Sequence, residues 1–298
     1  MANTKPGMNF GMPPEAYQFT SFPRNVDPTY RPHQLILLMA LIGGVIAGVI
    51  QLANTPDDFG AAIGAGLTIG AAAFVTWALA REVDPDKEYG SLFAALLVTL
   101  AALVIWTPLS AGLQLGPDVP PLNFLGLALL LFLTRIVNRS VGYPAKMGDY
   151  LLVLIFTGVV AFFSQWILAL VAINAFVLDA WFKPVNRKGF LFAVLVVPVT
   201  AVAVYLRGLT LLGADETAAG VEVFALGAGE AGTLSVFAAI LAALIATGYF
   251  FTLFLLRRVE AAADQTDEPL TVPRVRATMG LALLGAIVTA LWAGNAGM

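Results

Sequence analysis

Long uncharged apolar stretches alternate with short polar segments along the whole chain. The stretches cover 35–53, 61–80, 91–110, 122–134, 150–178, 189–206, 233–256 and 277–294, and none contains Lys, Arg, Asp, Glu or His. About 20 such residues cross the roughly 30 Å hydrocarbon core of a bilayer as a helix. Lipid offers no partner for an unpaired backbone group, and the stretches lack the alternation of barrel strands. The pattern therefore predicts transmembrane helices.

The stretch 150–178 is too long for one span, because its 29 residues would form a helix of about 44 Å. Cytoplasmic loops of membrane proteins accumulate Lys and Arg. If the chain turns back near Ser164 and Gln165, fifteen of the 16 basic residues fall on one side and only Arg207 on the other, whereas a single crossing divides them nine against seven. We therefore predict a hairpin here and about nine transmembrane helices, with the amino terminus cytoplasmic and the carboxyl terminus outside.

Composition supports this fold class. Hydrophobic residues make up 59% of the 298 residues and charged residues 12%, against about 45–50% and about 25% in globular proteins. We expect an all-α, polytopic integral membrane helical bundle over 35–298, with an acidic external loop at 207–232, preceded by an extended cytoplasmic tail at 1–34. The tail is not a secretory signal, and the plasma membrane, by default a prokaryotic inner membrane, is the expected location.

Several function classes are excluded by residue counts. The chain has no Cys and one His, so Cys or multi-His metal sites, iron–sulfur clusters and bis-His haem are excluded. A net charge of −3 does not favour nucleic-acid binding. The glycines at 227–232 match GxGxxG but lack the βαβ unit that a dinucleotide site requires. We predict no catalytic residue and no protein-only metal site.

The tail and the first spans carry two packing patterns. Residues 1–34 contain six prolines and five aromatic residues, which favours an extended segment that is either unattached or laid on a neighbouring subunit. Glycine pairs four residues apart, Gly44 with Gly48 and Gly66 with Gly70, let helices approach closely. That approach serves packing within this chain or against a partner.

Few polar residues fall inside the predicted spans. Ionisable residues at span centres mark ion-coupled transporters, and this chain has none there. Asn174 is the candidate intramembrane polar residue. It is expected either to bond a neighbouring helix or, together with Thr200, to line the chamber of a carrier for neutral solutes.

The predicted cytoplasmic loops combine acids and bases. The candidate residues for binding a lipid headgroup or a Mg²⁺-diphosphate are Asp84, Asp86, Arg135, Arg139, Asp179, Lys183 and Arg187. Carboxylates hold Mg²⁺, and Lys and Arg hold phosphate. The same residues also arise where cations follow the positive-inside rule and acids are interspersed for solubility.

The topology resembles that of the UbiA-type intramembrane prenyltransferases. Nine spans, Arg31-Pro32-His33 at the start of the first and acidic groups between spans 2–3 and 6–7 carry the likeness over most of the chain. The resemblance implies a Mg²⁺-bound prenyl diphosphate on the cytoplasmic face. Of the family motif N-D-x-x-D-x-x-x-D, however, only Asp84 is present, with Thr76, Trp77 and Ala80 at the other acid or amide positions.

The leading functional hypothesis is a non-catalytic accessory or scaffolding subunit of a larger membrane complex, whose partner subunits contact residues 1–34. One alternative is a divergent UbiA-like prenyltransferase or a binder of isoprenoid or anionic lipid, and only this alternative needs Mg²⁺. Another is a carrier of neutral solutes. Membrane lipids are expected partners in every case.

Overall fold

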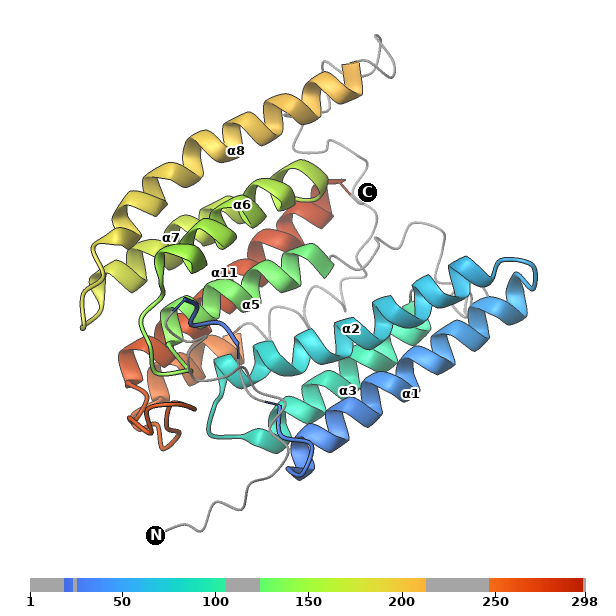
Figure 1. Cartoon of the computed structure of the whole chain (residues 1–298), viewed down its shortest axis with the longest axis horizontal. Coiled ribbons are helices and arrows are strands. Elements are labelled where there is room, and N and C mark those ends of the chain that lie inside the picture. The colour runs from blue at the N-terminus through green and yellow to red at the C-terminus, as the bar shows by residue number, and fades with distance from the viewer. Residues whose placement is uncertain (1–18, 24–25, 106–123, 213–246, 297–298) are drawn as a thin grey trace. The chain divides into compact units, whose positions relative to one another are not determined.

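The structure, a computed structural model, describes residues 19–23, 26–105, 124–212 and 247–296. Within these ranges the chain is helical, with one isolated β-bridge between Ala262 and Pro269, which confirms the all-α prediction. The helices are α1 (Arg31–Asn54), α2 (Phe59–Val83), α3 (Glu88–Ile105), α5 (Phe124–Asn138), α6 (Met147–Phe163), α7 (Leu168–Trp181), α8 (Lys188–Leu212) and α11 (Val272–Ala296), and a short helical segment covers 247–255 (Figure 1).

The chain divides into two compact units. The first contains α1, α2 and α3, and the second contains Phe19–Phe22 together with α6, α7, α8 and α11, so that the boundary falls inside α5. Tail residues 1–18, the part of the predicted external loop beyond residue 212 and the glycines at 227–232 lie outside the described residues.

Four of the described helices are long and apolar enough to cross a membrane: α1, α2, α8 over Lys188–Gly208 and α11 over Val272–Thr289. The helices α3, α5, α6 and α7 are apolar but shorter. The lengths and apolar composition of these helices are compatible with a membrane protein. The number of spans and their orientation stay predictions.

The predicted reversal inside 150–178 is confirmed. Helix α6 ends at Phe163 and α7 begins at Leu168. The Tyr150 hydroxyl in the first turn of α6 donates to Asp179 in the last turn of α7, so both arms return to the same end. At 1.5 Å per residue the 17 and 14 residues of the two helices extend about 26 Å and about 21 Å, which is less than a full hydrocarbon core.

Glycines bring α1 and α2 into backbone contact in the first unit. A Cβ atom on Gly44 would lie 2.7 Å from the Gly66 carbonyl oxygen, and one on Gly70 would lie 2.9 Å from the Ala40 carbonyl oxygen. The glycine pairs therefore serve packing within this chain, and packing against a partner stays a prediction. Helix α3 also packs on both helices and places the Thr99 side chain against Gly43.

The second unit is built around α6, α7 and α8. Helix α8 packs along both α6 and α7 (Figure 1), and its start is so close to α7 that a Cβ on Gly189 would meet the Phe176 carbonyl oxygen at 2.4 Å. Three fully buried aromatic residues fill the centre: Tyr150 stacks on Phe192 with ring centroids 4.9 Å apart, and both contact Phe176.

We predict that Gly44→Ala destabilises the first unit by about 1–3 kcal/mol, because the added methyl group overpacks a backbone contact. Gly64→Ala is the matched control on α2, since a Cβ there meets nothing within 4 Å. Thermal unfolding in detergent compares the two variants. Equal unfolding temperatures would show that the close helix approach does not contribute to stability.

Candidate functional site

A buried carboxylate joins four helices at one end of the second unit. Asp179 is fully buried. Arg139 donates to its Oδ1 from Nε at 3.0 Å and from Nη2 at 2.8 Å, and Arg274 donates to the same oxygen from Nη1 at 3.2 Å. The Tyr150 hydroxyl donates to Oδ2. We call these four residues the Asp179 cluster; they come from the end of α5, the start of α6, the end of α7 and the start of α11.

Local backbone geometry places the two arginines. Arg139 directly follows α5 and has a φ of 55°, a left-handed conformation that ends the helix. Arg274 lies in the first turn of α11 and also donates to the carbonyl oxygens of Val137 at 2.8 Å and Phe182 at 3.0 Å. Carbonyls at helix ends lack intrahelical partners, so Arg274 satisfies groups of α5 and α7 as well as Asp179.

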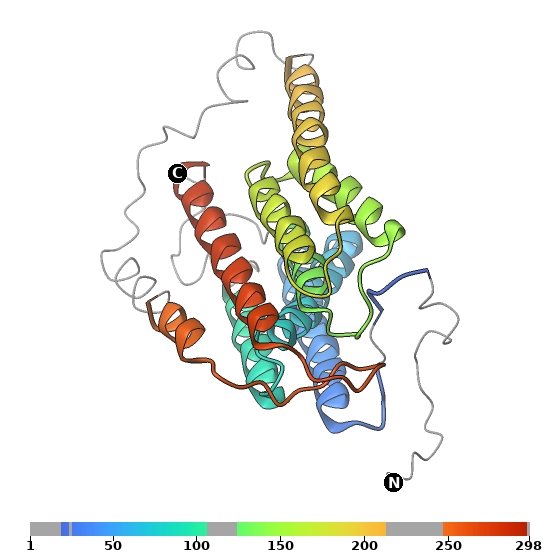
Figure 2. The same ribbon diagram turned by 90° about the vertical axis from the view of Figure 1, so that its left-hand side faces the viewer.

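The segment before α11 adds a loop to this end of the unit. It doubles back at a turn over 264–266, with an antiparallel bridge between Ala262 and Pro269 (Figure 2). Its Asp264 and Gln265 amides donate to the carbonyl oxygens of Ser140 at 2.9 Å and Val141 at 3.2 Å. Gly142, with a φ of 101°, packs against Thr266 so closely that a Cβ would lie 2.2 Å from the threonine hydroxyl oxygen. The loop thus covers the turn that carries Arg139.

A second buried carboxylate holds part of the tail. Asp149 accepts hydrogen bonds from the Thr20 hydroxyl at 2.5 Å, from the Ser21 amide at 2.9 Å and hydroxyl at 2.8 Å, and from the Lys146 amide at 2.8 Å. The last of these is part of a capping box that starts α6. Phe22 is buried beside Phe132. Residues 19–22 therefore bind their own chain.

The predicted contact of residues 1–34 with neighbouring subunits stays a prediction for the rest of that segment. Arg135 contributes to the self-contact, since its Nη1 donates to the Phe22 carbonyl oxygen at 2.8 Å. A predicted headgroup ligand thus serves to hold the tail. Asp149 lies 129 residues from Thr20 and 128 from Ser21, and no pattern in the sequence linked these residues.

The single histidine joins the helix ends of the first unit. His33 is buried, with Nε2 2.9 Å from Arg81 Nη1 and Nδ1 3.2 Å from the Asp27 carbonyl oxygen. A guanidinium can only donate, so Nε2 accepts from Arg81, and the Asp27 amide nitrogen lies 2.9 Å from Nδ1. The Trp77 and Tyr30 rings lie edge-on to the imidazole at 5.3 and 5.0 Å. His33 thus has a packing role at the start of α1.

Ionisation in the first unit follows from local contacts. Burial, reinforced by a hydrogen bond to the Glu88 carboxylate, raises the pKa of the Tyr30 hydroxyl to about 12. The Thr29 hydroxyl, 2.6 Å from Asp27 Oδ1, lowers the pKa of that carboxyl. Partial desolvation raises the pKa of the Asp84 carboxyl against the opposing effect of Lys87, whose Nζ lies 3.9 Å from it.

The candidate binding residues predicted from the sequence lie in different units and differ in their exposure. Asp84 and Asp86 are exposed residues of the first unit. Arg139 and Asp179 meet as a buried ion pair in the second unit, while Lys183 and Arg187 are exposed. In the described part of the chain no group of three or more His, Asp or Glu residues stands close enough to hold a metal ion.

The two polar residues predicted to lie inside the membrane, Asn174 and Thr200, differ in their exposure. Asn174 is exposed on α7, and its Nδ2 donates to the Leu170 carbonyl oxygen of the same helix at 2.8 Å. Thr200 on α8 is buried, and its hydroxyl has no hydrogen-bond partner among the described residues. A chamber shared by the two residues stays a prediction.

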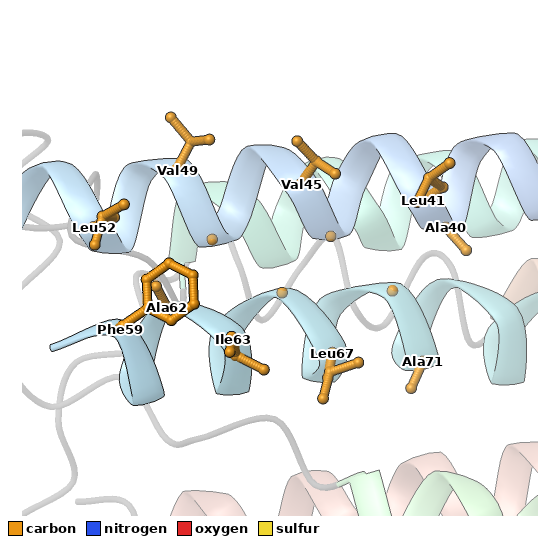
Figure 3. A pocket seen from close by; sticks show the side chains of 14 residues that line it. Ala40, Leu41, Val45, Val49, Leu52, Phe59, Ala62, Ile63, Leu67 and Ala71 are labelled. Carbon is orange, nitrogen blue, oxygen red and sulfur yellow. The ribbon is translucent and has the colours of Figure 1, made fainter.

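An open apolar groove of about 630 Å³ runs between α1 and α2. Its residues come from these two helices alone, with Gly44, Gly48, Gly66 and Gly70 along the contact between them. Figure 3 shows Val45 and Val49 projecting away from α2 and Leu67 projecting away from α1. The larger side chains Val45, Val49 and Leu67 are exposed, whereas Ala62 is buried. None of the lining side chains carries a hydrogen-bonding group.

Comparison with protein-family models finds no match, and comparisons with curated proteins and with solved structures find no similar chain. The likeness to UbiA-type prenyltransferases therefore stays a prediction from topology. The function has to be argued from the geometry of this chain.

We predict that Asp179→Asn destabilises the protein by about 3–5 kcal/mol, because it leaves two buried guanidinium groups without their counter-charge. Asp86→Asn, at an exposed carboxylate, serves as the control and is expected to change stability by no more than about 0.5 kcal/mol. Denaturant unfolding in mixed micelles measures both. If Asp179→Asn left the free energy of unfolding unchanged, a structural role for the Asp179 cluster would be contradicted.

We predict an alkaline loss of stability that depends on Tyr30. The hydroxyl pKa is 10.0 ordinarily and about 12 in the folded protein, so its stabilisation is complete below pH 10 and is lost as pH rises through 12. A titration followed by tyrosinate absorbance should lose one late-ionising group in Tyr30→Phe. The control Tyr89→Phe, at an exposed tyrosine of α3, should keep that group; the reverse result would refute the assignment.

Proposed function

We propose that this chain is a non-catalytic accessory or scaffolding subunit of a membrane complex. Asn174 carries the proposal. It lies in the middle of α7 with an exposed side chain, and while its Nδ2 bonds Leu170, its Oδ1 accepts no hydrogen bond from the described residues. An amide exposed on an otherwise apolar helix is a feature of helices that associate with others.

The energetic reason is desolvation. An amide oxygen that faces hydrocarbon without a donor has lost its bonds to water and is costly. A hydrogen bond from a neighbouring transmembrane helix removes this cost, and polar side chains of this kind bond across helices in membranes. Leu170, one turn before Asn174, is 47% exposed and supplies apolar contact area on the same face. The proposed partner is therefore a helix with a hydrogen-bond donor.

The buried polar groups support a scaffolding role. Asp149 and Asp179 use their oxygen atoms to join helix ends and the tail. Such clusters hold elements in place and leave these carboxylates without free coordination for a substrate. The exposed apolar surfaces of α1 and α8 suit the hydrocarbon of a bilayer.

The proposal includes a location and a topology. We place the protein in the plasma membrane of a prokaryote with about nine spans and a cytoplasmic amino terminus. The support is the charge distribution, which then puts all basic residues except Arg207 on the cytoplasmic side.

The test is purification in a gentle detergent followed by mass spectrometry of co-purifying chains. We expect partner chains with the unmodified protein and a several-fold loss of them with Asn174→Leu, which removes the amide at similar volume. The control is Ile155→Ala, an apolar substitution at a 64% exposed position of α6, which should retain the partners. Purification of the unmodified protein alone, or equal retention by Asn174→Leu, would overturn the proposal.

A further inference from the structure

Two groups of basic residues in the second unit differ in what their charged groups contact. In one group each guanidinium bonds the protein itself: Arg135 bonds the Phe22 carbonyl, Arg139 and Arg274 bond Asp179, and Arg276 donates to the Leu256 carbonyl at 3.0 Å. These cations hold the end of the unit together and are not available to a ligand.

The other group lies between α7 and α8. Lys183, Arg187 and Lys188 are all exposed. The ion pairs and side-chain hydrogen bonds of the described residues do not involve their charged groups. We call these three residues the α7–α8 basic cluster. No acidic residue occurs between Trp181 and Leu191, and Asp179 just before them is buried and paired with two arginines. The cluster therefore presents three positive charges without local compensation.

An exposed apolar face begins at the same place. Helix α8 starts at Lys188, and Phe190, Val194 and Val197 follow at helical spacing, with Val194 68% and Val197 58% exposed. Trp181, at the end of α7, is 71% exposed beside the cluster. Tryptophan is enriched where the hydrocarbon core meets the headgroups.

We propose that the α7–α8 basic cluster binds the phosphates of anionic phospholipids whose acyl chains lie along the exposed face of α8. Lys and Arg are the residues that bind phosphate, and anionic lipids attract basic segments next to membrane helices. A soluble anion would satisfy the cations but leave the adjoining apolar face uncovered, whereas a phospholipid matches both. The inference rests on the membrane residence in the proposed function and not on a partner subunit.

The experiment measures lipid binding to the purified full-length protein by native mass spectrometry, with phosphatidylglycerol and phosphatidylcholine titrated separately. The triple variant Lys183→Gln, Arg187→Gln, Lys188→Gln is expected to bind phosphatidylglycerol about tenfold more weakly, with phosphatidylcholine binding unchanged. Thermal unfolding should match the unmodified protein, because the charged groups of these side chains make no hydrogen bond or ion pair with the described residues.

Two further variants separate charge from fold and position. The charge-preserving triple variant K183R/R187K/K188R should retain phosphatidylglycerol binding. The matched control K87Q/R257Q/R258Q removes three exposed cations outside the cluster and should also retain it. Asn174→Leu should leave lipid binding intact even where it releases partner chains, so the two proposals fail independently.

Three results would overturn the inference. The first is unchanged phosphatidylglycerol affinity in the Gln triple variant, and the second is an equal loss in the matched control, which would indicate a general charge effect. The third is binding of inorganic phosphate that depends on the cluster and competes fully with phosphatidylglycerol, which would assign the cluster to a soluble anion.

Discussion

The ion pairs between Asp179 and the two arginines Arg139 and Arg274 are the constraint on which the second unit depends. Moving three charged groups out of water is costly, and mutual attraction offsets that cost only when the geometry is complete and the remaining donors are satisfied. Such additional hydrogen bonds are present in this cluster. Arg274 also donates to two helix-end carbonyl oxygens, and the Tyr150 hydroxyl donates to the second carboxylate oxygen of Asp179. The ends of α5, α6, α7 and α11 are consequently held in one place.

The two units are stabilised by different physical means. In the first, glycines allow direct backbone contact between α1 and α2, and dispersion over that contact needs no polar partner. In the second, buried carboxylates organise the helix ends and the tail residues 19–22. Because the second unit uses its inward cations for this purpose, its exposed cations, among them the α7–α8 basic cluster, remain for interactions outside the protein. A scaffold in contact with lipid is consistent with this division.

The helical character, the reversal near Ser164 and the glycine-mediated packing could be predicted, because each follows from local sequence: apolar length, charge distribution and residue size. The candidate site could be predicted only in part. Asp179 was grouped with Lys183, its sequence neighbour, as a headgroup ligand. Its actual partners lie 40 and 95 residues away, and no spacing rule links residues so distant.

The amino-acid sequence by itself determined which segments become apolar helices and that an amide lies in the middle of α7. Both follow from the length of the apolar segments and the order of the residues, which are local properties of the chain. Only the tertiary structure decided that Asn174 is exposed while Asp179 is enclosed. The two residues lie five positions apart on one helix, and a helix presents every direction within one turn. Which direction is buried depends on where α6, α8 and α11 pack, and that is a property of the assembled fold.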